Sequence, residues 1–586
     1  MKRIILLFGI FLLFVSPILA QTLQDYVLET RGDTLVVKDD NDYGAPNTLY
    51  SLMNADSSAP ADRVYLLHNG GIYSLVNNPT SSATHKTIIM GETQTSLKVS
   101  GTATAPPILQ GSTFQGGNTT GGINSGGDLL VKNVDVEIGN SAGSEGWAFF
   151  GFSGPSERIQ VDNCIIEHNL WTVIGGPPAN ESMFFTNDYF VNLDGYTCRR
   201  NGGVIDYFSN QDTIFVENCT HVNTQGSLYK TRPAYAINKV LFNHNDFIDC
   251  SGFVFMNSGG DQANYSVTNN IFVNCQLQAY APVLSNSDVG EVDVDSLPMG
   301  LVNLKADSLF LANGASFYAD RNLVYWDPSL SDIVTTLNTN KVNGSTNWVS
   351  QMITMNKRTA DLFNDKTNYP RLTNGTWIEN QLPSFKKTDV LFTTQLATLK
   401  AYSISAVDTS FTGTLKSWRQ PSNPESQYYT YADWPIPIDL SYTDNNLLTA
   451  GLNGFPVGDL DWFPTQYAAW KAQESTELAQ IANVLKNGIT GIEKTTVVPK
   501  QFQMQQNYPN PFNPTTVINF TIPKSGNVTL KVYNLLGQEV ATLVDGYRTA
   551  QTYNINFNAS NLASGVYIYT IRYGDQTISK KMVLMK

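Results

Sequence analysis

The feature that most constrains the fold is a repeat in the middle of the chain. Six segments share a hydrophobic stretch, an asparagine and a further apolar pair, and their asparagines are Asn133, Asn163, Asn187, Asn218, Asn245 and Asn270. Successive asparagines are 24 to 31 residues apart. A strand-and-turn repeat of this length without a helical period is typical of a solenoid. Leucine-rich repeats need a leucine spacing that is missing here, and propeller blades need about 40 residues or more.

A right-handed parallel β-helix fits this repeat best, because each coil then contributes short strands to stacked parallel sheets. Asn245–Cys250 and Asn270–Cys275 align residue by residue. Asparagine tolerates the left-handed conformation of a coil corner and can hydrogen-bond its counterpart on the next coil. We therefore predict an all-β body.

Four of the five cysteines stand at repeat positions: Cys164, Cys219, Cys250 and Cys275. We expect them to be buried ladder residues rather than nucleophiles. Because Cys250 and Cys275 align on adjacent coils, a disulfide between them after export remains open.

The start of the body predicts a cap and the first coils. Asn47–Met53 has the pattern of a short amphipathic helix, and an open solenoid end needs such a cap. Val64–Leu67, Gly70–Tyr73 and Thr87–Gly91 follow as strand, turn and strand. This run resembles the opening of pectate-lyase-like β-helix proteins, over roughly residues 45–330. The resemblance implies the fold and carries no catalytic signature.

The C-terminal segment has a different pattern. Asn507–Pro514 is a proline-rich entry in which no helix can form. Three runs of alternating apolar residues follow, separated by turns at Asn534–Gly537 and Arg572–Asp575: Val517–Phe520, Val528–Tyr533 and Gly565–Ile571. Short alternating strands with tight turns predict a small Ig-like antiparallel β-sandwich.

This segment also closely resembles the C-terminal sorting domain of the bacterial type IX secretion system. The resemblance covers the NYPNPFNP entry, the YNLLGQEV strand and turn, the SGVY strand and the basic end at Lys580-Lys581. It implies export across the outer membrane, followed by removal of the tail or attachment to the cell surface. The partner of residues 501–586 would be the outer-membrane secretion machinery.

The N-terminus predicts a secretory signal peptide. Lys2 and Arg3 precede an apolar run over Ile4–Val15 and a small-residue exit that ends at Ala20. The run is too short for a membrane anchor. We therefore expect a mature protein without a membrane span, which travels through the periplasm and is secreted or attached to the outer-membrane surface.

The chain divides into five predicted parts: a signal peptide at 1–20, a capped β-helix at 21–330, an irregular flanking region at 331–463, a helix and linker at 464–500, and the sorting domain at 501–586. Asn322–Trp326 reads as one further coil, or as the second of two coils with an insertion. Gln466–Lys486 has helical spacing and ends at Asn487-Gly488. The flanking region is expected to cover one flank or the C-terminal end of the β-helix.

The charge of the chain excludes one class of partner. Lysine and arginine total 37 against 50 aspartate and glutamate, for a net charge of −13, and loss of Lys2 and Arg3 makes it −15. An acidic chain is a poor nucleic-acid binder. We therefore expect no nucleic-acid partner.

The candidate for chemistry is a cationic column. Alignment of the coils by their turns places Arg199, Lys230 and Met256 in one column, with Arg200 and Arg232 beside it, and equivalent residues of a β-helix stack about 4.8 Å apart. Such cations could hold a uronic-acid carboxylate or sulfate. Lysine with a pKa lowered by cationic neighbours could remove a proton.

This arrangement is similar to that of β-helix polysaccharide lyases. It makes Lys230 the base, Arg199 or Arg232 the group that neutralises the substrate carboxylate, and Arg200 and Asn257 substrate-binding residues. A surface stack neutralised by Asp206 and Asp261 is the alternative.

Other sites have less support. Asp39–Gly44 begins like a calcium loop, but Tyr50 stands where an EF-hand needs glutamate, so only a looser calcium site remains open. His168, His221 and His244 fall at different repeat offsets and predict no zinc column. A hydrolase would need two or three acids on one face, for which the sequence offers Asp206, Glu217 and Asp249.

Two functions from different classes remain open. One is an extracellular enzyme, a lyase of acidic polysaccharides. The other is a non-catalytic surface or adhesion protein whose β-helix is a rigid binding scaffold. A β-helix fold supports both.

Overall fold

The computed structural model describes most of the chain in separate stretches. These are residues 22–45, 47–75, 86–92, 96–99, 104–111, 121–138, 148–167, 172–193, 203–224, 227–230, 235–252, 254–256, 262–277, 300–304, 316–333, 336, 352–388, 391–405, 434–488, 502–507, 509–524, 526–548 and 552–586. The predicted signal peptide and the linker at 489–500 lie outside the described residues.

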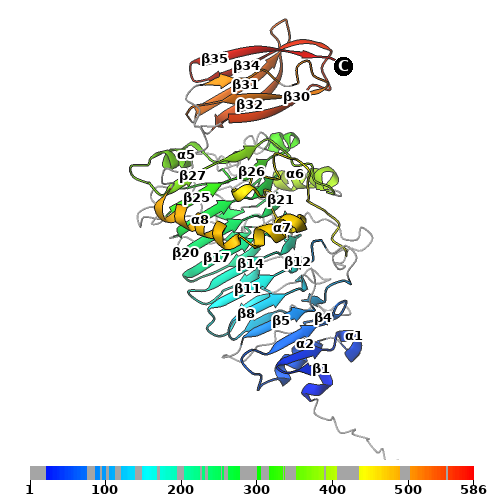
Figure 1. Cartoon of the computed structure of the whole chain (residues 1–586). Coiled ribbons are helices and arrows are strands. Elements are labelled where there is room, and N and C mark those ends of the chain that lie inside the picture. The colour runs from blue at the N-terminus through cyan, green and yellow to red at the C-terminus, as the bar shows by residue number, and fades with distance from the viewer. Residues whose placement is uncertain are drawn as a thin grey trace, which may run out of the picture.

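The body is a parallel β-helix, as the repeat predicts (Figure 1). Three sheets, here called A, B and C, run along the stack.

Sheet A contains twelve strands: β1 (Val27–Arg31), β2 (Thr34–Val37), β3 (Val64–Leu67), β5 (Thr87–Gly91), β8 (Leu129–Lys132), β11 (Arg158–Asp162), β14 (Ser182–Thr186), β17 (Gln211–Glu217), β20 (Ile237–Asn243), β23 (Gln262–Thr268), β25 (Ser316–Asp320) and β27 (Leu372–Asn374). Its strands pair in parallel except β1, which pairs antiparallel with β2.

Sheet B contains ten strands: β4 (Ile72–Ser74), β6 (Ile108–Gln110), β9 (Asp135–Glu137), β12 (Ile165–Glu167), β15 (Tyr189–Val191), β18 (Thr220–Thr224), β21 (Asp246–Cys250), β24 (Ile271–Val273), β26 (Asn322–Tyr325) and β28 (Trp377–Glu379). Sheet C contains six: β7 (Ile123–Ser125), β10 (Phe150–Phe152), β13 (Thr172–Gly175), β16 (Gly203–Asp206), β19 (Tyr229–Lys230) and β22 (Phe255–Met256).

The corner between sheets A and B explains the asparagine repeat. The residues with left-handed backbone at this corner are Asn133, Asn163, Asn187, Asn218, His244, Asn269 and Arg321, with φ between 52° and 61°. Asparagine adopts the left-handed conformation at a low energetic cost. At the fifth and sixth repeats the corner residue therefore stands one position before the predicted asparagine.

Asn245 and Asn270 form a separate amide ladder instead. The Nδ2 of Asn245 donates to Oδ1 of Asn270 at 2.9 Å, and Nδ2 of Asn270 donates to Oδ1 of Asn322 at 3.0 Å. Each side chain thus satisfies polar groups of the next coil.

The β-helix extends beyond the predicted boundary at residue 330. β25 pairs directly with β23, so Asn322–Trp326 belongs to one further coil with a long insertion before it. β27 and β28 then pair with β25 and β26 and add a coil inside the segment expected to be irregular. These two strands have three residues each, too few to display a period in the sequence.

Apolar and aromatic side chains from successive coils fill the interior. Phe190, His221, Phe247 and Phe272 stack with ring centroids 4.8, 4.4 and 5.1 Å apart. At the N-terminal end, α1 (Asp40–Tyr43) and α2 (Thr48–Ala55) form the cap, and α2 buries Leu49, Leu52 and Met53, as predicted.

The four cysteines at repeat positions are buried, as expected, and are free thiols. Cys250 and Cys275 are therefore not joined in this structure. Burial, followed by the neighbouring Cys250 side chain, raises the pKa of the Cys275 thiol.

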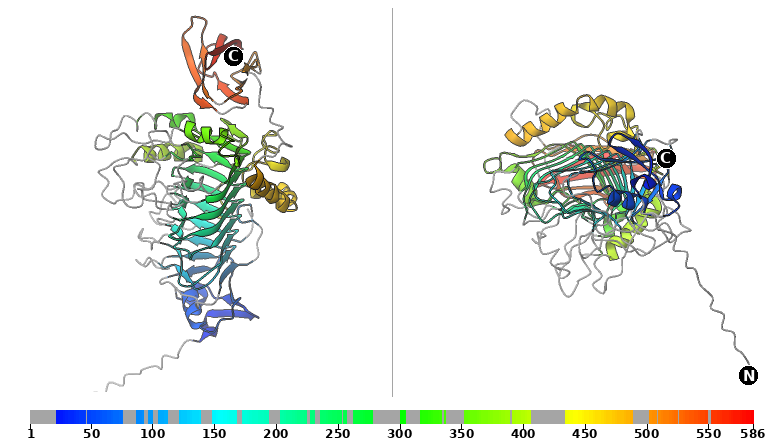
Figure 2. Two further views of the ribbon diagram at one scale, coloured as in Figure 1. Left: turned by 90° about the vertical axis from the view of Figure 1, so that its left-hand side faces the viewer. Right: turned by 90° about the horizontal axis from the view of Figure 1, so that it is seen from below.

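A chain segment from residue 434 onwards covers one flank of the stack, as Figure 2 shows for the helices. The predicted single helix is two helices, α7 (Pro464–Lys471) and α8 (Glu474–Asn487). Ile481 and Leu485 of α8 pack on Phe215, Leu241 and Tyr318 of sheet A. α5 (Lys357–Asn364) and α6 (Leu396–Ser405) lie near the C-terminal end.

A buried ion-pair cluster of Lys98, Asp459 and Asp461 connects this segment to the coils. Lys98, from the connection between β5 and β6, places Nζ 2.6 Å from Oδ2 of Asp459 and 3.1 Å from Oδ2 of Asp461. Its ammonium also donates to the carbonyl oxygen of Asn218 at 2.6 Å. Thr220 Oγ1 donates to the same Asp459 carboxylate at 2.7 Å. The lysine side chain is 1% exposed, so the ion-pair cluster is desolvated.

The C-terminal domain has two antiparallel sheets around its own core. One holds β29 (Gln503–Met504), β30 (Thr515–Thr521) and β33 (Thr552–Asn558), and the other holds β31 (Gly526–Tyr533), β32 (Glu539–Arg548), β34 (Gly565–Tyr573) and β35 (Gln576–Leu584). The predicted alternating runs form β30, β31 and β34, and their inward residues make a separate cluster. The predicted β-sandwich is confirmed.

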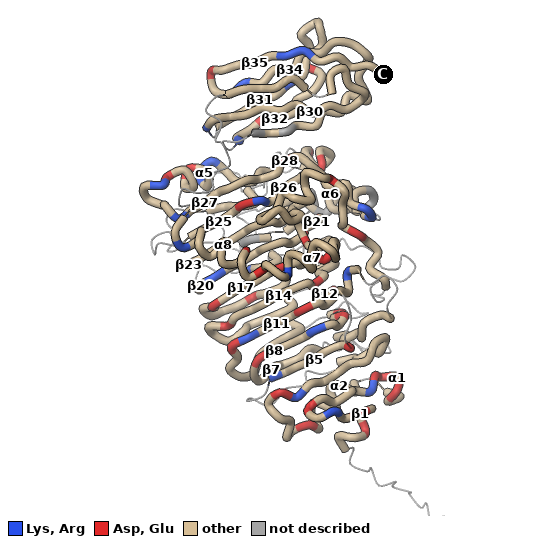
Figure 3. Tube along the Cα trace, viewed as in Figure 1, with Lys and Arg blue, Asp and Glu red and all other residues tan. Residues whose placement is uncertain are grey.

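Charged residues of both signs are interspersed along the described coils (Figure 3). Within the described stretches, no helix combines the length and the apolar character needed to cross a bilayer.

Candidate functional site

The structure describes two residues of the predicted cationic column, Lys230 and Met256. Lys230 of β19 pairs with Met256 of β22, so these two residues share a column as expected. The neighbour of Lys230 on the preceding coil is Asp206, since Ile205 pairs with Tyr229.

Asp206 thus occupies the column position that the coil alignment gave to Arg199, because β16 begins at Gly203. The other predicted site residues, Arg199, Arg200, Arg232 and Asn257, lie outside the described residues, as does Asp261.

Lys230 is a buried member of an ion pair. Its Nζ lies 3.8 Å from Oδ2 of Asp206, and the two side chains are 2% and 9% exposed. Tyr229 points into the core, so Lys230 points away from it on the outer face of sheet C. A neighbouring carboxylate stabilises the charged ammonium, which is the opposite of what a base requires.

The three acids proposed for a hydrolase do not meet. Asp206 ends β16 in sheet C, and Glu217 ends β17 in sheet A, where Asn243 Nδ2 donates to it at 2.8 Å. Asp249 occupies a left-handed turn in β21 and accepts from Asn274 Nδ2 at 2.8 Å.

A different set of acids gathers on the outer face of sheet B. Asp135 and Glu137 belong to β9, and Glu167 of β12 pairs directly with Glu137. Val136 and Ile166 between them point into the core, so the three carboxylates point outward. They are 4%, 3% and 2% exposed. We call Asp135, Glu137 and Glu167 the acid trio.

Burial disfavours three ionised carboxylates in the acid trio. Burial, and next the charge of Glu167, raises the pKa of Asp135 and of Glu137 well above the ordinary range. Asp135 also lies within hydrogen-bonding reach of Glu167, a contact that needs one shared proton. Among the described residues, Oδ1 of Asp135 has no hydrogen-bond partner. The raised pKa of Asp135 and of Glu137 thus favours their protonated forms.

The sequence contained a signal for the trio that was missed. Glu137 and Glu167 each stand four residues after a corner asparagine, Asn133 and Asn163, in consecutive coils. Such equivalence places two glutamates side by side in a β-helix. Asp135 stands two residues before Glu137 on the same strand, so alternation places it on the same face.

The described histidines have separate roles. His221 is buried between two phenylalanine rings, and this burial lowers its pKa to about 3. His244 Nε2 lies 3.1 Å from Oε1 of Glu477 on α8. Burial alone would raise the pKa of Glu477, but the hydrogen bond and charge of His244 hold it below its ordinary value. His168 lies outside the described residues.

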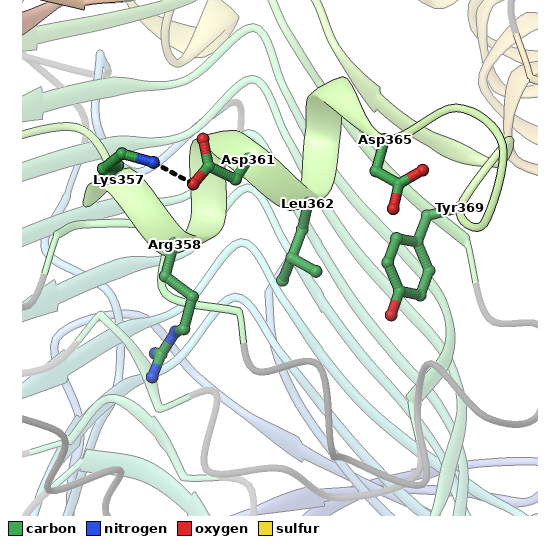
Figure 4. Close-up of a pocket in the computed structure, with 6 residues that line it drawn as sticks. All are labelled: Lys357, Arg358, Asp361, Leu362, Asp365 and Tyr369. Atoms are coloured by element: carbon green, nitrogen blue, oxygen red, sulfur yellow. Dashed lines mark hydrogen bonds and ion pairs between the residues drawn. The ribbon is translucent and has the colours of Figure 1, made fainter.

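A surface pocket of about 400 Å³ lies along α5 (Figure 4). It is lined by Lys357, Arg358, Asp361, Leu362, Asp365 and Tyr369. Lys357 pairs with Asp361, and Arg358 Nε donates to the carbonyl oxygen of Leu304 at 2.9 Å. Its charged groups therefore serve local structure, and the pocket contains none of the predicted site residues.

One buried carboxylate outside the trio gives a pH prediction. Burial raises the pKa of Glu181 to about 7, although Ser156 Oγ donates to it at 3.0 Å. A carboxyl with a raised folded-state pKa stabilises the fold below its unfolded pKa, and this contribution is lost as the pH rises through the folded value.

We expect Glu181→Gln to match the wild type near pH 5 and to be more stable at pH 8, by about 1–2 kcal/mol. Urea unfolding of both proteins across this range measures the difference. Parallel pH profiles for the two proteins would contradict the assignment.

Comparison with known proteins identifies one part of the chain. Residues 506–585 match the family described as the secretion system C-terminal sorting domain. No curated protein matches the chain. The match agrees with the sandwich of β29 to β35, and it indicates export to the cell surface or secretion.

Proposed function

We propose that this chain, which carries a type IX secretion sorting domain over residues 506–585, presents a β-helix that binds and cleaves an extracellular polysaccharide. The observation that carries the proposal is the acid trio on two adjacent coils of sheet B. Its parts are Asp135, Glu137 and Glu167.

Glycoside hydrolysis needs two carboxyl groups, one acting as an acid and one as a base or nucleophile. One carboxylic acid protonates the leaving oxygen, and a carboxylate activates water or attacks the sugar. A raised pKa keeps the acid protonated near neutral pH, and the pKa of Asp135 and of Glu137 is raised. The trio is 2–4% exposed in this structure, so the proposal requires that a glycan gain access to these buried groups.

A second candidate is the lyase reaction on an acidic polysaccharide. Lys230 would be the base, Arg199 or Arg232 would neutralise the carboxylate, and Arg200 and Asn257 would bind the sugar. It is supported by the outward direction of Lys230 and opposed by its pairing with Asp206.

The third candidate is a non-catalytic surface or adhesion protein. It is favoured by an exposed part of sheet A, where the Arg158 guanidinium lies 4.0 Å from the ring centre of Phe184. Aromatic rings beside cations on a rigid sheet suit sugar binding without chemistry.

One experiment separates the three candidates. The mature protein is incubated with pectin, alginate, glycosaminoglycans and a neutral xylan. New reducing ends report any cleavage, and ultraviolet absorbance reports the unsaturated product of a lyase. We expect reducing ends without ultraviolet absorbance, and loss of about 10²–10⁴-fold in rate for Glu167→Gln, as for removal of an acid–base catalyst.

Glu181→Gln is the matched control, because it also neutralises a buried carboxylate and should keep its activity. Ultraviolet product that is lost in Lys230→Met and kept in Glu167→Gln would replace hydrolysis by the lyase reaction. Binding to a glycan without any product would leave the scaffold function.

A further inference from the structure

The N-terminal cap brings together three potential metal ligands that the sequence separates. Asp39 caps the N-terminus of α1, Asp42 lies within this helix, and His68 follows β3. One oxygen of each aspartate and one ring nitrogen of His68 all lie within 4.8 Å of one another. No other group in the described part of the chain meets this criterion.

The first ligand is held in place by the cap itself. Asp39 is 5% exposed, and its Oδ1 accepts from the backbone N–H of Asp42 at 2.6 Å. Its Oδ2 is 3.4 Å from the backbone nitrogen of Ile72. These contacts fix the carboxylate between α1 and β4 and orient it toward Asp42 and His68.

The His68 imidazole lies between two oxygen atoms of the cap region. Its Nδ1 is 3.4 Å from the carbonyl oxygen of Asn69, and its Nε2 is 3.2 Å from Oδ2 of Asp42. Nε2 is thus the ring nitrogen that faces Asp42, and Nδ1 faces the backbone.

Metal-binding histidines commonly have this arrangement, in which the second ring nitrogen donates to a backbone carbonyl. The ring edge of His68 also contacts Tyr73, with centroids 6.0 Å apart. The Tyr73 hydroxyl accepts from the His68 backbone N–H at 3.0 Å. These contacts hold the His68 imidazole in position without a bound metal.

We propose that Asp39, Asp42 and His68 bind one divalent transition-metal ion, with zinc the best match. Calcium prefers six to eight oxygen ligands, whereas an imidazole nitrogen with two carboxylates suits zinc. The side chains of Asp42 and His68 are 46% and 26% exposed, so solvent completes the coordination. The calcium site expected at Asp39–Gly44 is thus proposed as a zinc site instead, with His68 as an additional ligand.

The bound ion would connect α1 to the turn after β3. It would tie the cap to the first coil, at the end where the stack lacks a neighbouring coil. This role is independent of the acid trio and of any activity on glycans.

The test uses the mature secreted protein, freed of metal with a chelator and titrated with zinc chloride by calorimetry. We expect one zinc per chain and a rise in the melting temperature of the wild type with zinc. Asp42→Asn and His68→Gln should each weaken binding at least about tenfold. Asp62→Asn removes an exposed carboxylate outside the group and should bind as the wild type does.

Circular dichroism confirms that each variant is folded, and the exposed Asp42 makes its variant the safer one. Zinc binding that is absent from the wild type, or unchanged in Asp42→Asn, would overturn the site. Tighter binding of calcium than of zinc would overturn the assigned class of metal.

Discussion

A chain that lacks residues 501–586 is expected to fold and to remain in the periplasm. The sorting domain has its own hydrophobic core, and among its described residues Tyr547 packs against the core of the β-helix. Among the described residues, the ionic contact between the two is Arg548 Nε with Glu379 Oε2, at 3.9 Å. Removal of the domain should therefore leave the body intact and abolish nearly all delivery to the surface or medium.

Cell fractionation in a host with type IX secretion measures the distribution of both chains. Protease resistance of the periplasmic material shows that the truncated body is folded, and the intact chain is the control. Truncated protein at the surface at the level of the intact chain would refute the sorting assignment. Degraded protein in place of folded protein would refute the independence of the body.

Replacement of Lys98 by methionine is expected to destabilise the body by about 3–5 kcal/mol at pH 8. The substitution keeps the length of the side chain but leaves Asp459 and Asp461 buried without their counter-ion. Urea unfolding at constant temperature measures the effect. Lys86→Met is the matched control, since Lys86 pairs with Asp62 at the surface and should cost less than about 1 kcal/mol.

The loss in Lys98→Met should be smaller near pH 5. Burial raises the pKa of Asp459 to about 6, and without the ammonium it rises further, so protonation relieves the variant as the pH falls. Addition of Asp461→Asn to Lys98→Met should recover part of the stability. If the double variant were no more stable than Lys98→Met, unpaired charge would not be the cause.

The sequence predicted the elements with local signals closely. Val64–Leu67 and Thr87–Gly91 are β3 and β5 with the same bounds, and α2 begins one residue after the predicted start. Turn chemistry and alternation are properties of a few neighbouring residues, so they are readable without the fold. The same holds for the sorting domain, whose strands are joined by short turns.

The register of the coils was harder to predict from the sequence. A corner in a β-helix is defined by its backbone conformation, and the repeat pointed to Asn245 where His244 has the left-handed backbone. The column of Lys230 was misread for the same reason, because the connections between strands differ in length from coil to coil. The alignment put Arg199 beside Lys230, whereas the described neighbour is Asp206, seven residues later in the chain.

By itself, the sequence determined a solenoid with a cap and a separately folded sorting tail, because period, composition and turn residues are local. The tertiary structure alone decided which side chains meet. Lys98 joins Asp459 across 361 residues, and His68 reaches Asp42 across 26. Such contacts depend on connection lengths and on the path of the returning chain, and no local pattern encodes either.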